Sequence, residues 1–448
     1  MMSSLPCTII RGGRVIDPLS GLDATADVLL HGDRVQAVGG HVDAPADAAV
    51  IDAEGCIVTP GLIDVHVHLR DPDISGRHDE TIATGAAAAA AGGFSTVCCM
   101  PNTTPPMDSV DVVRDICTRA DAAQQARVFP VGCGTMGRAG TRIAPIQDLV
   151  DAGAVAISDD GDGIADDDMM ASVLQAVADA DTVFMQHCQD PEHTQDAAMH
   201  AGVLATRMGV GGWPREAEVS MLQRDIDLNR TIGARYHAQH MSVAESMNAI
   251  RTARAEGLHV SGEASPHHLL LTEDACEGWN TMAKVNPPLR TAADVQALRE
   301  AVADGTITVL ATDHAPHPAS SKATDFQSAS FGMSCIEICL PLYREALIDS
   351  GAIEWPRLIA LMTIEGAALT GLGRLGLGSL TVGGPADVTI IDPDASWQVD
   401  PASFRSRGRN TPFARRALRG RALATIAAGG LLWHRLGERL AHQTAAAL

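Results

Sequence analysis

Lysine is almost absent from this 448-residue chain, which contains only Lys284 and Lys322. Arginine therefore carries nearly all of the positive charge, and the formal net charge is −22. A chain this acidic is a poor partner for nucleic acid or for an anionic membrane, so we expect neither. A negatively charged substrate would need arginine or histidine side chains placed locally around it.

The chain also lacks long apolar runs and a secretion signal. No stretch approaches the ~18 uninterrupted apolar residues that favour a membrane span, and residues 1–13 have no charged segment followed by a long apolar one. The ten cysteines are scattered without the spacing of a metal finger. We interpret them as small buried hydrophobic residues in a reducing cytoplasm, which is the location that we expect for the protein.

From Pro60 onward, strand-like and helix-like segments alternate. The apolar strand candidates are residues 62–67, 94–100, 127–133, 154–158, 182–187, 235–240, 258–263 and 306–312. The helix-like stretches between them include residues 79–91, 108–123, 167–180, 214–228, 243–256 and 292–304. Eight strands alternating with helices predict an α/β fold, a (β/α)8 TIM-like barrel. A doubly wound open sheet is the alternative.

The two ends of the chain have a different, β-rich pattern. Short apolar segments separated by turn residues occupy roughly the first 55 residues, and they return after a helical zone near residues 334–370. We expect segments from both termini to build one small β-sandwich domain beside the barrel. The predicted division is 1–58 and 372–432 for the small domain, 59–371 for the barrel, and 433–448 for a tail that resembles a frayed helix.

Two histidines, His66 and His68, close the first strand candidate of the barrel. Because side chains alternate along a strand, both imidazoles point to the same side and could grip one metal ion. An isolated His-x-His pair is more often an ordinary pair of polar residues. Four further strand ends carry residues of ligand type, and the carboxyl ends of barrel strands meet at one mouth. They are Asp159 and Asp160 after strand four, His187 after strand five, His240 after strand six, and Asp313 and His314 after strand eight.

Taken singly, each of these residues could belong to a turn, a helix cap or a satisfied core histidine. Their coincidence at five strand ends predicts a metal site at the mouth of the barrel. Four histidines and two carboxylates suit one or two zinc ions with room for a shared hydroxide.

At these residues the chain resembles the amidohydrolase superfamily and, within it, the dihydroorotases of the type found in bacteria and in multifunctional pyrimidine-synthesis proteins. The resemblance covers nearly the whole chain. The matching motifs are His66-Val67-His68-Leu69-Arg70-Asp71-Pro72, Met100-Pro101-Asn102-Thr103, Ser158-Asp159-Asp160-Gly161, His187-Cys188, Lys284-Val285-Asn286-Pro287-Pro288-Leu289-Arg290, Thr312-Asp313-His314-Ala315-Pro316-His317 and Phe331-Gly332.

The resemblance implies two zinc positions in each chain, with the occupancy of the second left open. The implied metal ligands are His66, His68, Asp160, His187, His240 and Asp313. Asp160 would be the carboxylate that bridges the two positions. Many relatives use a carboxylated lysine as that bridge, but neither lysine of this chain follows strand four.

The reaction implied by the resemblance is the reversible cyclisation of N-carbamoyl-L-aspartate to L-dihydroorotate in pyrimidine biosynthesis. We expect Asp313 to be the catalytic residue that carries a proton between the attacking water and the departing nitrogen. Arg70 lies two residues beyond the strand-one histidines, so alternation carries it into the mouth, where it can grip a carboxylate with two parallel bonds. The implied substrate-binding residues are Arg70, Asn102, Asn286, His317, Phe331 and Gly332. Residues 314–333 form a long connection that we interpret as a lid over bound substrate.

Two other functions stay open from the sequence. The chain could hydrolyse another cyclic amide, such as hydantoin, allantoin or dihydropyrimidine, although Arg70 and Asn102 favour a substrate with a carboxylate. It could also be an inactive structural partner of aspartate transcarbamoylase, but such chains have typically lost metal ligands. We expect a homodimer by default, and a complex with aspartate transcarbamoylase stays open.

Overall fold

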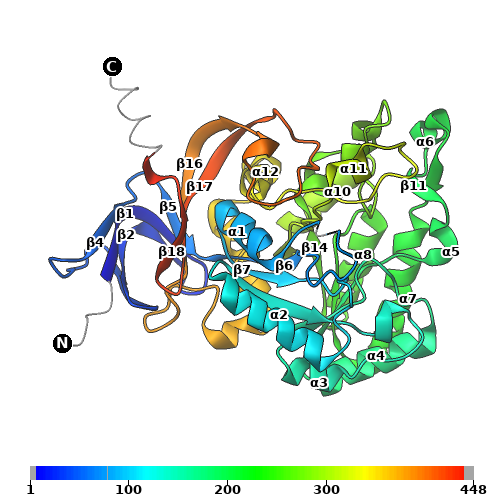
Figure 1. Cartoon of the computed structure of the whole chain (residues 1–448), viewed down its shortest axis with the longest axis horizontal. Helices are drawn as coiled ribbons and strands as arrows, with labels where there is room; N and C mark the ends of the chain where they lie inside the picture. Colours follow the sequence, from blue (N-terminus) through cyan, green and yellow to red (C-terminus); the bar gives the residue numbers. More distant parts are fainter. Residues whose placement is uncertain (1–6, 78, 438–448) are drawn as a thin grey trace.

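Eight parallel strands form a barrel in the computed structural model, which describes residues 7–77 and 79–437. Figure 1 shows the whole chain. In order around the barrel the strands are β6 (Leu62–Val67), β7 (Phe94–Cys99), β8 (Arg127–Gly132), β9 (Ala156–Ile157), β10 (Val183–Gln186), β13 (Arg235–Ala238), β14 (Val260–Ala264) and β15 (Val309–Leu310). Between β15 and β6 the ring closes through a parallel bridge of Val67 with His314 and through a 2.9 Å bond from His68 N to His314 O. The predicted barrel is confirmed, and the open-sheet alternative is wrong.

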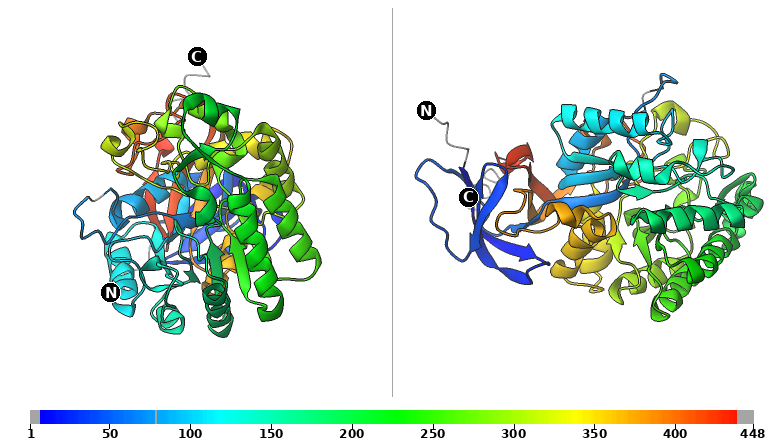
Figure 2. Two further views of the ribbon diagram at one scale, coloured as in Figure 1. Left: turned by 90° about the vertical axis from the view of Figure 1, so that its right-hand side faces the viewer. Right: turned by 90° about the horizontal axis from the view of Figure 1, so that it is seen from below.

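Helices follow most of the strands and cover the outside of the barrel (Figure 2). The longer ones are α1 (Ile82–Gly92), α2 (Val110–Ala123), α4 (Asp167–Asp179), α7 (Glu216–Ile232), α8 (Ala244–Ala255) and α10 (Ala292–Ala303). The predicted start of the first helix, at Asp79, is three residues early. Thr81 caps the helix instead, because its side chain accepts from Thr84 N in a reciprocal capping box. The helix predicted to stop at Leu228 continues to Ile232, where Gly233 ends it with φ of 75°.

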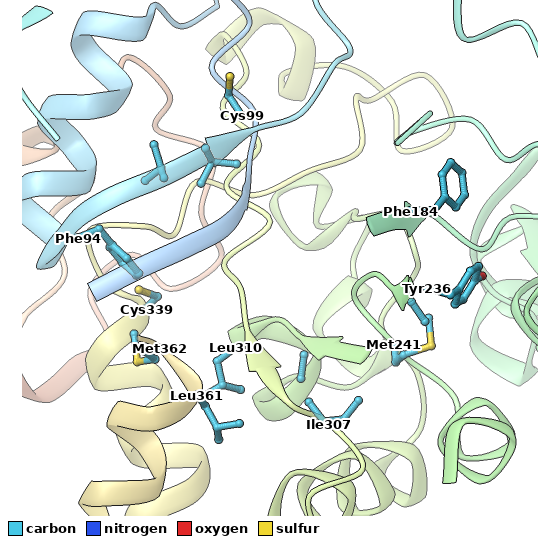
Figure 3. Close-up of a cluster of buried hydrophobic side chains, with 14 of the residues drawn as sticks. Phe94, Cys99, Phe184, Tyr236, Met241, Ile307, Leu310, Cys339, Leu361 and Met362 are labelled. Carbon is cyan, nitrogen blue, oxygen red and sulfur yellow. The ribbon is translucent and has the colours of Figure 1, made fainter. Parts of the chain in front are cut away.

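The main core lies between the barrel wall and the surrounding helices. Phe94, Phe184, Tyr236 and Leu310 are among its buried side chains (Figure 3). The alanine-rich α1 approaches its neighbours closely, and a Cβ on Gly92 would lie 2.3 Å from Ile336 O. The small residues of α1 therefore serve close packing.

Strands from both ends of the chain share a second sheet at one end of the molecule (Figures 1 and 2). Its members are β1 (Cys7–Asp17), β2 (Leu22–His31), β3 (Arg34–Gly39), β4 (Ala49–Asp52), β5 (Ile57–Pro60), β16 (Val388–Gln398), β17 (Ala417–Ala427) and β18 (Gly430–His434). The antiparallel pairing of β5 with β16 joins the two halves. A small sheet domain built from both termini is thereby confirmed, and the strands of the predicted sandwich form one continuous sheet in the described residues. Most of the predicted tail, residues 438–448, lies outside the described residues.

The small domain is fastened to the amino ends of the first barrel strands. The buried Thr389 hydroxyl donates to Gly93 O at 2.6 Å, and Arg127 makes two bonds of 3.0 and 3.1 Å to the Asp387 carboxylate. The connection between β16 and β17, residues 399–416, runs to the opposite end of the barrel, because Asn410 within it contacts Ala315 beyond β15. The small domain therefore holds one end of the barrel and reaches the other.

Within the described residues, no helix combines the length and the apolar character needed to cross a membrane. None of the ten cysteines, all of which lie in the described residues, is part of a disulfide, and eight of them are buried. This agrees with their interpretation as small hydrophobic residues.

Candidate metal centre and substrate cavity

The four predicted histidines and two predicted aspartates meet at the carboxyl ends of the barrel strands. They come from β6 or from positions within three residues after β6, β9, β10, β13 and β15. All six side chains are buried. The fold thus brings the predicted residues from five strand ends together.

Asp160 lies at the centre of this cluster. One of its oxygens is 3.4 Å from His66 Nε2, 3.6 Å from His187 Nδ1 and 3.7 Å from His240 Nε2. Its other oxygen is 3.5 Å from His68 Nε2. Two groups can each enclose a cation, namely His66, His68 and Asp160, and Asp160, His187 and His240. Asp160 belongs to both groups.

Asp159, its neighbour in the sequence, points elsewhere. Its carboxylate accepts from Gly134 N at 2.9 Å, from Thr135 N at 3.1 Å and from the Thr135 hydroxyl. Asp159 therefore ties the loop after β8 to the loop after β9, while Asp160 faces the histidines.

Three of the imidazoles are held by the ring nitrogen that points away from Asp160, which we call the outer nitrogen; the nitrogen that faces Asp160 is the inner one. His66 Nδ1 donates to Glu263 Oε1 at 2.5 Å, His68 Nδ1 to Asn102 Oδ1 at 2.9 Å, and His187 Nε2 to Gln189 Oε1 at 2.8 Å. A proton on the outer nitrogen leaves the inner nitrogen with a lone pair. The inner nitrogens are therefore arranged as acceptors or ligands.

Several lone pairs consequently face one another without a proton between them. His66 Nε2 is buried, has no hydrogen-bond partner among the described residues, and lies 3.6 Å from Asp313 as well as close to Asp160. His187 Nδ1 accepts from His240 Nε2 at 2.8 Å, and His240 Nδ1 is buried without a hydrogen-bond partner among the described residues. Nitrogens and carboxylates so placed repel one another unless a cation lies among them, so the donor set fits a metal.

The two carboxylates at the centre are held in their charged form. Burial alone would raise the pKa of Asp160, but His66 and His68 outweigh it and hold the pKa well below its usual range. Burial is likewise overcome at Asp313, where the contact with His68 and the nearby His66 lower the pKa. Both groups are therefore available as anionic ligands, and Asp313 as a proton acceptor.

Three residues of the mouth adopt a left-handed backbone conformation, which is uncommon for a side chain that is not glycine. The φ angles are 54° at Arg70, 33° at His240 and 48° at Asp313. Such positions cost of order 1–3 kcal/mol each and tend to cluster at functional sites. Here the unusual backbone places two of the cluster residues and the neighbouring arginine.

A cavity of about 270 Å³ lies directly over the cluster. It is smaller than the sites of drug-sized ligands and suits a small molecule. All of the predicted substrate-binding residues line it: Arg70, Asn102, Asn286, His317, Phe331 and Gly332.

Unpaired polar atoms at the cavity indicate the kind of molecule that it accepts. Arg70 Nε and Asn286 Oδ1 are buried and have no hydrogen-bond partner in the part of the chain that the structure describes. Burial lowers the pKa of the Arg70 guanidinium, which nevertheless stays charged because the ordinary pKa of arginine lies far above neutral pH. A buried cation without a protein anion to bond points to an anionic ligand.

The predicted lid, residues 314–333, is an ordered loop with one short helix, α11 (Ala319–Lys322). Gly332 has φ of 127°, and a Cβ there would lie 2.7 Å from Ala315 Cβ, so glycine is needed at this turn of the lid. His317 Nε2 donates to Phe331 O at 2.7 Å and links the two ends of the loop.

Both lysines of the chain fasten this lid and neither lies at the metal centre. Lys322 Nζ donates to Thr281 O and Lys284 O at 3.0 Å, and Lys284 Nζ donates to Gln327 O at 2.8 Å. Lys284 Nζ also lies 4.2 Å from the centre of the Phe331 ring. The absence of a bridging lysine, expected from the sequence, agrees with this geometry.

Glu263 and Gln189 were missed by the sequence-based prediction. Glu263 lies in β14, the one late barrel strand to which we assigned no polar role, and it is fully buried. A carboxylate within an apolar strand was the available signal. Gln189 gave no signal, because its importance arises from bonding both His187 and Asn286 Nδ2, the latter at 2.9 Å.

Comparison with known proteins gives a consistent result. A family model described as dihydro-orotase-like matches residues 55–246. Among solved structures, the L-hydantoinase (dihydropyrimidinase) of Arthrobacter aurescens has a TM-score of 0.84 at 26% identity, with 96% of each chain covered. The dihydropyrimidinase of Brevibacillus agri NCHU1002 has a TM-score of 0.81 at 21% identity, covering 96% of this chain and 95% of that one.

The barrel, the added sheet and the histidine–aspartate cluster define a cyclic-amide hydrolase of the amidohydrolase type. Curated relatives narrow this class. The dihydroorotase of Syntrophotalea carbinolica is 44% identical over 425 residues, which are 95% of this chain and 98% of that protein. The dihydroorotase of Pelotomaculum thermopropionicum is 44% identical over 422 residues, with 94% and 97% covered. The chain belongs to the dihydroorotase family.

The buried lysines generate a prediction about titration. Burial, together with Lys284, lowers the pKa of Lys322 to about 7, and burial lowers that of Lys284 to about 8. Protein labelled with ¹³Cε-lysine should give two NMR signals that titrate near these values rather than near 10.4, the value for an exposed lysine. Because the unfolded chain then binds more protons than the folded one, stability should increase as the pH rises through this window.

Two controls assign the lysine signals. Lys322→Met should remove the signal with the lower midpoint, and in denaturant both signals should titrate near about 10.4. If both lysine signals of the folded protein titrate at about 10.4, the lid does not bury its lysines in solution.

Proposed function

We propose that the protein is a metal-dependent dihydroorotase that interconverts N-carbamoyl-L-aspartate and L-dihydroorotate in pyrimidine biosynthesis. The observation that carries this proposal is the unpaired Arg70 guanidinium, which shares a small cavity with the histidine–aspartate cluster. A cyclic amide that bears a carboxylate matches both features, since the cluster would face the amide and Arg70 the carboxylate.

Zinc is the metal that we propose, in two positions that share Asp160. His66 and His68 would hold one position with Asp160, and His187 and His240 the other, with Asp313 beside the first. The buried His66 Nε2 supports this assignment, because it lies 3.4 Å from Asp160 and 3.6 Å from Asp313 without a hydrogen-bond partner in the described residues. When bound, such an ion lowers the pKa of a coordinated water to about 7 and polarises a carbonyl oxygen.

Asp313 is the proposed proton carrier. Its carboxylate is ionised, lines the cavity and lies 3.1 Å from His68 Nε2. In hydrolysis it would take the proton of the attacking water and deliver it to the ring nitrogen that leaves the carbonyl carbon. In ring closure the same carboxylate would remove the proton from the ureido nitrogen that attacks the carboxyl carbon, and would deliver it to the carboxyl oxygen that leaves as water when its C–O bond breaks.

The other lining residues are proposed to orient the substrate. Arg70 would grip the carboxylate with two parallel bonds, assisted by the Asn102 amide nitrogen. The oxygen of Asn286 and the backbone at Phe331 and Gly332 would contact the ring amide. His317 donates its Nε2 proton to Phe331 O, so it could bond the carboxylate only through a second proton on Nδ1. The charge of the substrate would favour that protonation.

The proposal also covers the oligomeric state, the cellular location and the domain division of the chain. We propose that the chain is a homodimer, that it acts in the cytoplasm, and that the domain division is 1–58 with 372–432, 59–371 and 433–448. Association with aspartate transcarbamoylase is best tested by co-purification of the two proteins.

Activity is the first test. The purified protein should interconvert carbamoyl aspartate and dihydroorotate, as followed by the absorbance of the ring. Asp313→Asn should lower kcat by about 10²–10⁴, since that is the usual contribution of a positioned acid–base group. Asp227→Asn, at an exposed carboxylate on α7, serves as the control. Full turnover by Asp313→Asn would exclude the proton role, and an inactive wild type with metal bound would exclude the proposed function.

Metal content is a second test, because the two neighbouring aspartates should behave differently. Plasma mass spectrometry of the protein as purified should find zinc, and Asp160→Asn should reduce the metal bound per chain. Asp159→Asn should retain the metal and instead lower the free energy of unfolding by about 1–3 kcal/mol, because it weakens buried hydrogen bonds to the loop after β8. Equal metal loss in both variants would contradict the proposed bridge.

Substrate charge provides a third test. Arg70→Met should raise KM for dihydroorotate at least tenfold, since a hydrogen bond to a charged group contributes about 1.5–3 kcal/mol. Turnover of dihydrouracil, an uncharged ring, should change little. Arg230→Met, at an exposed arginine of α7, is the matched control. Equal losses on both rings, or better turnover of dihydrouracil by the wild type, would favour a hydantoinase-like specificity instead.

A further inference from the structure

A loop of the C-terminal sequence, residues 404–413, lies at the mouth of the barrel next to the lid. Two carboxylates hold it there, the partly buried Glu337 and the buried Glu80. Glu337 accepts from Arg405 N at 2.7 Å and from Ser406 N at 3.0 Å. Glu80, in the loop that follows β6, accepts from the Ser406 hydroxyl and from Arg407 N at 3.1 Å. The loop is therefore attached to the barrel by bonds that do not involve Asn410.

From this anchored loop, the side chain of Asn410 bonds to both ends of the lid. Its amide nitrogen donates to Ala315 O at 2.9 Å and to Gly332 O at 3.1 Å. Its oxygen accepts from His317 N at 3.0 Å and from the Ser334 hydroxyl at 2.7 Å. With an exposed fraction of only 2%, the Asn410 amide thus uses both of its donors and both of its acceptor positions inside the protein.

The groups that Asn410 bonds are close to the substrate cavity. Ala315, His317 and Gly332 all line it. The packing around the loop is equally close, since a Cβ on Gly408 would lie 2.4 Å from the Ser334 hydroxyl and 2.6 Å from Pro316 Cβ. The loop therefore has little freedom to shift away from the lid.

We propose that Asn410 is a positioning residue for the reaction: it fixes the two ends of the lid so that His317 and the Phe331–Gly332 backbone face the substrate. The small domain thereby contributes to the active site, although Asn410 does not line the cavity. This inference rests on the proposed function, because it concerns the same cavity.

Loss of the Asn410 amide would leave two carbonyls and one N–H of the lid without partners. The lid ends, still joined by the bonds of Ala315 N to Met333 O and of His317 to Phe331 O, would be held less firmly, and the contacts that hold the substrate before and during the reaction would weaken together. Such a loss raises KM and leaves kcat nearly unchanged, whereas a general loss of folded enzyme lowers apparent kcat. The ratio of the two effects distinguishes positioning from mere stability.

The experiment compares Asn410→Ala with Asn229→Ala in the metal-loaded, full-length protein. Asn229 is a suitable control because it is also buried, with its amide bonded to both backbone groups of Ala234 at 2.8 and 2.9 Å, at the far end of α7. Asn410→Ala should raise KM for carbamoyl aspartate about tenfold with kcat changed less than about twofold. Asn229→Ala should leave KM at the wild-type value.

Hydrogen exchange followed by mass spectrometry gives a readout that does not need activity. Amides of residues 314–334 should exchange about tenfold faster in Asn410→Ala, and not in Asn229→Ala. An inactive wild type would refute the proposed function, while this exchange result would still test the role of Asn410. Unchanged KM and unchanged lid exchange in Asn410→Ala, or equal changes in both variants, would overturn the inference.

If Asn410→Ala does not fold, Ser334→Ala takes its place, because it removes only the 2.7 Å bond to the Asn410 oxygen. It should raise KM and lid exchange in the same direction by a smaller factor. No change of either quantity in Ser334→Ala would then count against the inference.

Discussion

The Asp160 carboxylate lies within 3.7 Å of imidazole nitrogens from three barrel strands, and the arrangement of the mouth depends on this contact. Burial makes a bare carboxylate costly, and lone pairs of the surrounding imidazoles would add repulsion. The outer nitrogens of His66, His68 and His187 are already committed, so those rings cannot turn to relieve it. A cation shared by these groups satisfies all of them at once, which is why we assign the cluster to a metal.

Around that centre the fold supplies a second layer from unrelated parts of the chain. Glu263 and Gln189 hold two of the histidines, and Gln189 also holds Asn286, so that the metal cluster and the ring-binding side of the cavity are linked. The lid is secured by two lysines and, as we propose, positioned by Asn410. The small domain thus does more than cap the amino end of the barrel, since its connecting loop reaches the catalytic end.

Much of this could be predicted from local patterns. Parallel strands are buried on both faces, so each appears as an apolar run, and all eight were found in this way. His66 and His68 were recognisable because strand alternation aligns them. The start of α1 was placed too early, because the acidic Asp79 resembled a helix start while the hydrogen-bonded cap is Thr81. Asn410 could not be found, because its partners Gly332 and Ala315 are 78 and 95 residues away.

The sequence by itself determined the acidic charge, the alternation of strands and helices, and the residue types at the strand ends, because these follow from composition and from periods of two and 3.6 residues. The tertiary structure alone decided which nitrogen of each histidine faces the cluster and that the Arg70 guanidinium is left with an unpaired nitrogen. It also turned the Asp159 carboxylate toward Thr135 and away from the histidines. Burial and hydrogen-bond partners come from segments that meet only when the chain is folded, so no local pattern contains them.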